Sequence, residues 1–291
     1  MSTAPVLART REDLAAALAA LGERAVLVPT MGALHVGHRA LLATARTLAA
    51  GPVVVSVFVN PLQFDSATDL AAYPADLDAD LAVCAQEGAA VVFAPSVDQM
   101  YPAGPPSVRV AAGELGARLE GAVRPGHFDG MLTVVAKLFG LVRPRAALFG
   151  QKDAQQLALV TRMVTDLELG VEVVAVPTVR DADGLAASSR NVRLDAAARA
   201  RASAVPAALA AGAAAGSSGE ADRVVGAATD VLTDAGLAVD YVALVDPGTF
   251  ATVSSPTGRA LLVLAARVGG VRLIDNTAVV LAPPTAVRGG P

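Results

Sequence analysis

The hydrophobic positions of the chain fall into short blocks separated by glycine, proline and polar residues. Residues 25–28 (AVLV) and 53–59 (VVVSVFV) contain β-prone side chains with little polar alternation. Such blocks are typical of strands buried on both faces, as in a parallel sheet. A helix beginning at Gly37 and running to about residue 50 is predicted between them, ended by Gly51 and Pro52. Residues 25–59 are therefore predicted to form a strand–helix–strand unit.

The same alternation continues to residue 176. Further strands are predicted at 90–94, 146–149 and 171–176, and helices at 10–21, 75–87, 131–142 and from the turn at 150–153 to about 167. Thr10 and Asp13 are spaced for a near capping box at the first helix. Between these elements, residues 69–74 are expected to be irregular and residues 95–106 to form a loop. Residues 108–111 are expected to be extended, and residues 117–130 are rich in turn formers. Repeated strands and helices with short connections predict an α/β fold with a doubly wound, Rossmann-like parallel sheet.

Residues 177–191 (PTVRDADGLAASSRN) are polar and rich in turn formers, so we place a domain boundary there. The predicted domains are 1–177 and 178–291. The second contains predicted helices at 195–212 and 220–235, strands at 240–245, 260–268 and 273–275, and a tail at 282–291. This composition of elements predicts a smaller α+β domain.

Composition narrows the class of protein. The 291 residues suffice for two domains, and the net charge of −4 without a long basic run argues against a nucleic-acid partner. The charged residues among positions 1–24 interrupt any signal-peptide core, and no apolar run is long enough to span a membrane. A single cysteine, Cys84, fits a reducing compartment and is expected to pack in the core. We therefore expect a cytoplasmic protein.

The first stretch with chemical character is PTMGALHVGH, residues 29–38. His35 and His38 are spaced to face the same side of a helix. They lie in its first turn, where unpaired N–H groups and the helix dipole favour an anion. Gly37 leaves the backbone open to a ligand. This pattern predicts a nucleotide site, although two structural histidines at a helix start would give the same spacing.

Two further segments carry groups suited to phosphate. Residues 150–153 (GQKD) form a second strand-to-helix turn, where Lys152 opposes the helix dipole unless an anion binds. Residues 187–191 (ASSRN) gather two hydroxyls and a guanidinium, which favours either a mobile phosphate clamp or a helix cap with a surface arginine.

Other polar residues leave alternatives open. Gln63 and Gln156 could each fix a polar substrate or be solvated. Asp76, Asp78 and Asp80 could lie near Mg²⁺, which needs few carboxylates when triphosphate oxygens complete its shell, or could simply be solvated.

Five motifs in a fixed order, PTMGALHVGH, VNPLQF, RPGHF, FGQKDAQQ and PTVRDADGLAASSRN, resemble the pantoate–β-alanine ligase family. They span residues 25–193. That family belongs to the HxGH (HIGH-type) nucleotidyltransferase superfamily, which is related in fold to class I aminoacyl-tRNA synthetases. The resemblance implies that (R)-pantoate reacts with ATP and Mg²⁺ to give pantoyl-adenylate and pyrophosphate. The amine of β-alanine then displaces AMP and forms pantothenate. It also implies a homodimer and a C-terminal domain that closes over ATP.

The resemblance assigns roles to individual residues. His38 would be the proton donor, His35 its partner on the phosphate, and Lys152, Ser188 and Arg190 further catalytic groups. The residues implied at the ATP site are Thr30, Met31, Gly32, Ala33, Leu34, His35, Val36, Gly37, His38, Gly150, Gln151, Lys152, Asp153, Val179, Ala187, Ser188, Ser189 and Arg190. The chain departs from the usual family pattern at Gln151, commonly Glu, and at Ala187, commonly Met, where a smaller side chain would loosen packing on adenine.

Gln63 would hold pantoate and border β-alanine, and Gln156 would bind pantoate. Asn60, Arg124 and His127 are further candidates for the pocket wall, with an apolar lining from Pro29, Met31, Val134 and Val135. The spacing assigns neither Mg²⁺ ligands nor an anchor for β-alanine. The alternative functions are a nucleotidylyltransferase that transfers a nucleotide to a phosphate acceptor and a non-catalytic nucleotide-binding module.

Overall fold

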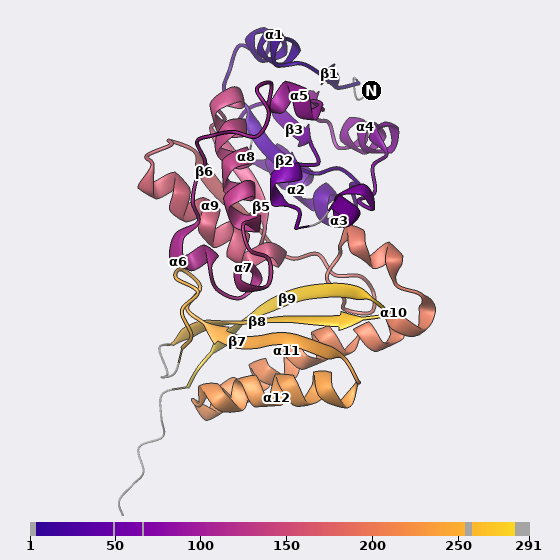
Figure 1. Ribbon diagram of the computed structural model, residues 1–291, viewed down its shortest axis with the longest axis vertical. Helices are drawn as coiled ribbons and strands as arrows, with labels where there is room; N and C mark the ends of the chain where they lie inside the picture. The colour runs from indigo at the N-terminus through magenta and orange to yellow at the C-terminus, as the bar shows by residue number, and fades with distance from the viewer. Residues whose placement is uncertain (1–3, 49, 66, 254–257, 283–291) are drawn as a thin grey trace, which may run out of the picture. The chain divides into compact units, whose positions relative to one another are not determined.

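The computed structural model describes residues 4–48, 50–65, 67–253 and 258–282. The chain divides into two compact units (Figure 1). The N-terminal unit contains Met1–Gln151 and Gln155–Val179, and the C-terminal unit contains Lys152–Ala154 and Arg180–Pro291. The division after Val179 falls close to the predicted boundary, but the sequence did not indicate that Lys152–Ala154 belongs with the second unit.

The N-terminal unit is built on a six-stranded sheet of order β1-β4-β3-β2-β5-β6, in which every pairing is parallel. Its strands are β1 (Val6–Ala8), β2 (Val26–Thr30), β3 (Val53–Val57), β4 (Val91–Phe93), β5 (Ala146–Gly150) and β6 (Glu172–Val176). The doubly wound α/β fold predicted from the sequence is confirmed.

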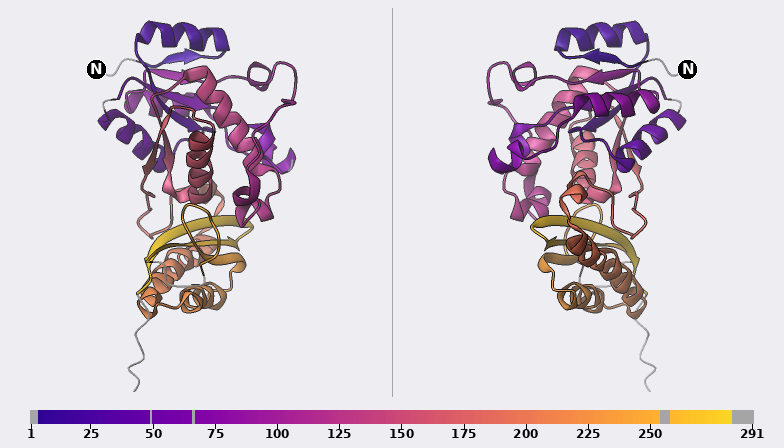
Figure 2. Two further views of the ribbon diagram at one scale, coloured as in Figure 1. Left: turned by 90° about the vertical axis from the view of Figure 1, so that its left-hand side faces the viewer. Right: turned by 90° about the vertical axis from the view of Figure 1, so that its right-hand side faces the viewer.

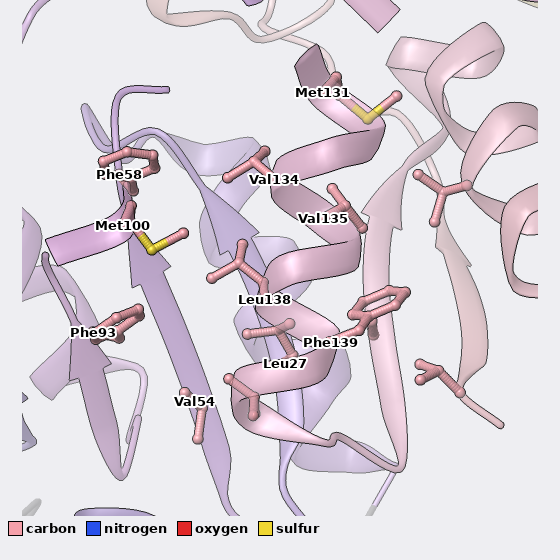
Figure 3. Packing of buried hydrophobic residues seen from close by; sticks show 14 of the residues in the cluster. Leu27, Val54, Phe58, Phe93, Met100, Met131, Val134, Val135, Leu138 and Phe139 are labelled. Atoms are coloured by element: carbon pink, nitrogen blue, oxygen red, sulfur yellow. The ribbon is translucent and has the colours of Figure 1, made fainter. Parts of the chain in front are cut away.

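Helices cover both faces of this sheet (Figure 2). The helices α1 (Arg11–Leu21), α8 (His127–Val142) and α9 (Ala154–Asp166) contribute to one hydrophobic cluster, and α2 (Val36–Thr47) and α4 (Leu77–Gln86) contribute to another. Successive strand residues serve the two clusters in turn, because side chains alternate across a strand. In β2, Leu27 belongs to the first cluster and Val26 and Val28 to the second. Figure 3 shows side chains of α8, including Val134 and Leu138, beside Leu27 and Val54 of the strands.

The order of strands reverses between β2 and β5. The chain passes from β2 to β3 on one side and returns later to β5 on the other side. In open α/β sheets, ligands bind beside the carboxyl ends of the strands at such a switch point. Residues 29–38 begin with the last two residues of β2 and continue from this edge, and Gly150 ends β5 at the same edge.

Several boundaries differ from the predictions. The sequence missed β1, because three residues at a sheet edge are too few for a recognisable period. The helix predicted at 131–142 begins at His127. Short helices overlap segments expected to be irregular, namely α3 (Ala67–Ala71), α5 (Val97–Met100) and α7 (Glu120–Val123). A further short helix, α6 (Gly113–Gly116), lies where no element was predicted. Residues 108–111 form no strand. Cys84 is fully buried, which raises the pKa of its thiol to about 12 and fits the expected core position.

The C-terminal unit has a three-stranded antiparallel sheet of β7 (Ala238–Val245), β8 (Arg259–Val268) and β9 (Val271–Val280). The helices α11 (Ala204–Ala215) and α12 (Ala221–Asp234) pack on it. The helix predicted at 195–212 is divided into α10 (Ala196–Ala202) and α11, and the strand predicted at 273–275 is the longer β9. The predicted tail lies, apart from residue 282, outside the described residues. Within those residues, no helix is both long and apolar enough to cross a membrane.

Candidate active site

Residues 29–38, here called the histidine turn, connect β2 to α2 through two left-handed residues, Gly32 (φ 85°) and Ala33 (φ 52°). The carboxylate of Asp80 on α4 accepts hydrogen bonds from the N–H groups of Ala33 (3.1 Å) and Leu34 (2.8 Å). A Cβ atom on Gly32 would lie 2.7 Å from Oδ2 of Asp80. A residue with a side chain would be strained at this backbone angle and would have to displace the Asp80 carboxylate.

The three aspartates near this turn have different roles. Asp80 is 3% exposed, so the expectation of a solvated carboxylate is wrong for it. Burial raises its pKa, and the hydrogen bonds from Leu34 and Ala33 partly oppose that rise. Asp76 caps α4 by accepting from the N–H of Ala79 (3.0 Å), and Asp78 is exposed. Across the described parts of the chain, no group of three or more His, Cys, Asp or Glu residues could hold a metal ion.

The two histidines cap their own helix. Nδ1 of His35 accepts from the N–H of Gly37 (3.1 Å), and Nδ1 of His38 accepts from the N–H of His35 (3.2 Å). Two N–H groups of the first turn are thus occupied by imidazole nitrogens rather than left for an anion. Because each Nδ1 is an acceptor, the proton of each neutral ring is assigned to Nε2. The ring centroids are 4.1 Å apart, so the turn contains a pair of neighbouring Nε2–H donors.

Gln63 is fixed beside Met31 by a buried amide network. It ends the 3₁₀ turn Pro61–Gln63 after β3, donates from Nε2 to Sδ of Met31 (3.0 Å) and accepts from Nδ2 of Asn60 (3.0 Å). Asn60 is 1% exposed. Its Nδ2 also donates to the carbonyl of Gly130 (3.0 Å), and its Oδ1 accepts from the hydroxyl of Tyr101 (2.8 Å). These bonds use both amide groups of Asn60, so it positions Gln63 and does not form an open pocket wall.

Arg124 and His127 hold the backbone of Gln63. Nδ1 of His127 donates to the Gln63 carbonyl (2.7 Å), and Nη2 of Arg124 donates to the same oxygen (3.2 Å). Nη1 of Arg124 lies 3.1 Å from Nε2 of His127, and Nε lies 3.1 Å from the Asp65 carboxylate. Burial, followed by the Arg124 charge, lowers the pKa of His127 to about 4. His127 is therefore neutral near pH 7, with its proton on Nδ1.

The remaining candidates of the N-terminal unit are less closely connected. Gln156 is partly exposed on α9, whereas its neighbour Gln155 is buried and holds the loop before α7 through Glu120 N and the carbonyls of Leu115 and Arg118. Pro29 and Met31 are partly exposed, and Val36 and Gln151 are exposed. Val134 and Val135, predicted as apolar lining of the pocket, are only 6% and 4% exposed (Figure 3). Their side chains are therefore mainly part of the hydrophobic core.

In the C-terminal unit, Lys152, Ser188 and Arg190 line one pocket together with Arg272. We call this the basic pocket. Its other lining residues are Leu185, Ala186, Asn191, Leu273 and Ile274. The side-chain amide of Asn276 donates to the carbonyl of Lys152 (3.0 Å), which ties the lysine to β9. The structure thus brings together the lysine and the serine–arginine pair that the sequence singled out.

The loop bearing Ser188 and Arg190 is braced by ion pairs. Arg199 bonds Asp181 and Asp183 (both 2.7 Å), and its hydrogen bond lowers the pKa of Asp183. Arg180 forms a bidentate pair with the buried Asp275 (2.6 and 3.1 Å). Ser188 caps the 3₁₀ turn Ser189–Arg193 by accepting from the N–H of Arg190, and Ala187 is buried. The cap predicted as one alternative is therefore present, but Arg190 is only partly exposed and lines the basic pocket.

Sequence reasoning missed the parts played by Tyr101, Asp65, Arg199 and Arg272. Tyr101 and Asp65 bond partners 41 and 59 residues away, whereas Arg199 bonds Asp181 and Asp183 from 18 and 16 residues along the chain, outside the motif itself. Asp76 and Asp80 are four residues apart and share a helix face, but this spacing does not indicate which loop the Asp80 carboxylate contacts.

A parallel sheet with an HxGH turn at its switch point defines an HxGH-type nucleotide-binding α/β protein. The model of the family described as pantoate-beta-alanine ligase matches residues 6–278. The chain belongs to this family, as the motifs predicted.

Named relatives agree with this assignment. The pantothenate synthetase of Nocardioides sp. is 55% identical, covering 97% of this chain and 87% of that protein, and the one of Acidothermus cellulolyticus is 57% identical, covering 94% and 91%. The pantothenate synthetase of Thermus thermophilus has a similar fold, with a TM-score of 0.87, 46% identity and coverage of 94% and 98%. A pantoate-beta-alanine ligase from Francisella tularensis, complexed with beta-gamma ATP and beta-alanine, has a TM-score of 0.79, 32% identity and coverage of 94% and 97%.

Proposed function

We propose that the chain condenses (R)-pantoate with β-alanine to pantothenate, converting ATP to AMP and pyrophosphate through a pantoyl-adenylate. Family membership supports this reaction, and the ligand names of the Francisella structure match its substrates. The observation that carries it is the pair of Nε2–H donors in the histidine turn, at the sheet's switch point, with the Gln63 amide held beside Met31 of the same turn.

In the first step, a carboxylate oxygen of pantoate attacks the α-phosphorus of ATP. The bond from that phosphorus to the bridging oxygen breaks, and its electron pair leaves with pyrophosphate. Fixed donors aimed at the growing charge lower the barrier to such a step. His35 and His38 supply two of these donors through Nε2–H, and His38 is the residue to which the family resemblance assigns proton donation. Gln63, assisted by Gln156, binds the pantoate.

In the second step, the free amine of β-alanine attacks the acyl carbonyl, AMP leaves with the electron pair of the acyl–oxygen bond, and the nitrogen loses one proton to the phosphate of AMP or to water. A carboxylate alone has a poor leaving group, so adenylation makes this step possible. Arg124 acts here through the Gln63 backbone that it holds, and the wall of Pro29 and Met31 faces the apolar part of pantoate.

The phosphates of ATP are assigned to the basic pocket. Lys152, Ser188, Ser189 and Arg190 bind them, while Gly150, Gln151, Asp153, Val179 and Ala187 complete the nucleotide site. We propose that the C-terminal unit closes over ATP. Magnesium would be held mainly by triphosphate oxygens and water, since Mg²⁺ is commonly bound through few protein carboxylates.

A homodimer in the cytoplasm is the remaining part of the proposal. The single, buried cysteine supports a reducing compartment. Light scattering tests the dimer, which requires twice the chain mass of 29.1 kDa. A mass of one chain at micromolar concentration would contradict it.

The reaction is tested by following AMP and pyrophosphate separately in the presence of ATP and Mg²⁺. We expect stoichiometric pyrophosphate when (R)-pantoate alone is added, and AMP release only after β-alanine is supplied. (S)-Pantoate serves as the matched control. Pyrophosphate formation that does not depend on pantoate would exclude the ligase reaction and favour transfer of the nucleotide to another acceptor.

A further inference from the structure

The basic pocket contains a cation that the sequence motifs do not include. Besides Lys152 and Arg190, it is lined by Arg272, the second residue of β9. Three positively charged side chains around one pocket favour a ligand with several negative charges. A single carboxylate would not need them all.

Arg272 is held in place from one side. Its Nε donates to Oδ2 of Asp240 on β7 (2.5 Å), and its guanidinium carbon lies 6.0 Å from the centre of the Tyr241 ring. Its side chain is only 16% exposed. A guanidinium has five N–H donors in a planar fork, so one anchored through Nε can also bind the oxygens of a ligand. Asp240 therefore orients the guanidinium that lines the pocket.

Arg267 provides an internal comparison. It lies directly opposite Arg272 in the β8–β9 register and shares the same carboxylate, with Nε 3.2 Å from Oδ1 of Asp240. However, its side chain is 50% exposed, and it does not line the basic pocket. Two arginines with the same ion-pair partner thus differ in their access to the pocket.

We propose that Arg272 binds the β- and γ-phosphates of ATP, and hence the departing pyrophosphate, together with Lys152 and Arg190. This inference rests on the proposed function of the same site. When the bond to the α-phosphorus breaks, the electron pair moves to the bridging oxygen of the pyrophosphate. A guanidinium fixed near these phosphates stabilises that charge through paired N–H bonds.

The test compares Arg272→Met with Arg267→Met, using inorganic pyrophosphate and Mg²⁺ as the probe in calorimetric titrations of the full chain. For Arg272→Met we expect a dissociation constant at least about 10-fold higher, the usual scale for losing a charged hydrogen bond. For Arg267→Met we expect a change within about twofold, as for an exposed ion pair. In steady state, the KM for ATP should rise in Arg272→Met, with the KM for β-alanine unchanged.

Arg272→Lys, which keeps the charge but loses the fork, should show an intermediate loss and serves if Arg272→Met does not fold. The inference would be overturned if the Arg272 variants bound pyrophosphate with the dissociation constant of the wild type. It would also be overturned if the Arg267 and Arg272 variants lost affinity for pyrophosphate equally. The outcome is separable from that of the proposed function. Arg272-dependent pyrophosphate binding without pantoate-dependent AMP formation would contradict the ligase reaction and leave the Arg272 assignment standing.

Discussion

The histidine turn of the N-terminal unit and the basic pocket of the C-terminal unit are suited to phosphate in different ways. In the turn, the donors are imidazoles fixed by backbone N–H groups, and Asp80 holds the adjacent backbone. In the pocket, the donors are full positive charges, and carboxylates such as Asp240 brace them. Cations attract a phosphate before and during reaction, whereas directional donors can favour the transition state. We therefore expect variants of the turn to lower kcat and variants of the pocket to raise the KM for ATP.

The largest effect is expected for His38→Ala. Loss of one fixed donor should reduce the rate of adenylation about 10²- to 10³-fold, with the KM for ATP changed only a few-fold. Single-turnover release of pyrophosphate with (R)-pantoate measures this rate. His38→Gln, which can retain an N–H donor, should recover part of the loss. A defect confined to KM would remove the distinction between the two regions.

Lys152→Ala should cost at least about 10²-fold in kcat/KM for ATP in the adenylation step, chiefly through KM. Because the lost interaction is ionic, the variant should also depend less on salt than the wild type does. Initial rates between low and high ionic strength measure both quantities. Lys152→Arg is the charge-conserving control. An unchanged salt dependence would indicate that Lys152 acts through something other than its charge.

Gly32→Ala tests whether the turn needs its left-handed geometry. A side chain at φ 85° is strained, and its Cβ would displace the Asp80 carboxylate. We expect about 1–2 kcal/mol lower stability and an activity loss of about tenfold. Urea unfolding and kcat measure these effects. Ala33→Gly is the matched control, since Ala33 already has φ 52° and glycine should relieve that strain. Wild-type activity in Gly32→Ala would mean that the bonds to Asp80 are dispensable.

The smallest effect concerns His127, a buried neutral imidazole of the N-terminal unit. Because its pKa in the folded chain is lowered to about 4, only the unfolded chain takes up this proton near pH 6. The contribution of neutral His127 to the free energy of unfolding is therefore lost as the pH falls through about 6.5. Between pH 7.5 and 6 this loss is about 0.8 kcal/mol. His127→Asn should remove that part of the pH dependence. Denaturant unfolding at the two pH values tests this. An equal change in the free energy of unfolding between pH 7.5 and 6 for the wild type and the variant would contradict it.

Much of the fold was predictable because local patterns determine it. The apolar blocks of β2 and β3 are buried on both faces, as their lack of polar alternation indicated. Thr10 and Asp13 form the expected capping box, and Gly22 follows in a left-handed conformation. Where local signals were weak, as in the three residues of β1 or the break between α10 and α11, the predictions were wrong.

The site was predictable as a set of motifs, but not as a set of contacts. The histidines, Gln63 and Lys152 could be singled out because each is a polar or basic side chain in a segment that comes soon after a predicted strand. The groups that orient them come from distant parts of the chain: Asp80 lies 46 residues from Leu34, and Tyr101 lies 41 residues from Asn60. Helix capping by the imidazole rings could not be predicted either, because it depends on side-chain rotamers rather than spacing.

The tripeptide Lys152–Ala154 belongs to the C-terminal unit, although the chain on either side of it belongs to the N-terminal unit. A fragment expressed from Arg180 onward would therefore lack Lys152, and with it the carbonyl that accepts from the Asn276 amide. Replacing residues 180–291 with the corresponding segment of a relative would likewise combine the β9 of one protein with the Lys152–Ala154 segment of another. A working chimaera would need two junctions more than the linear order of the domains suggests, one before residue 152 and one after residue 154.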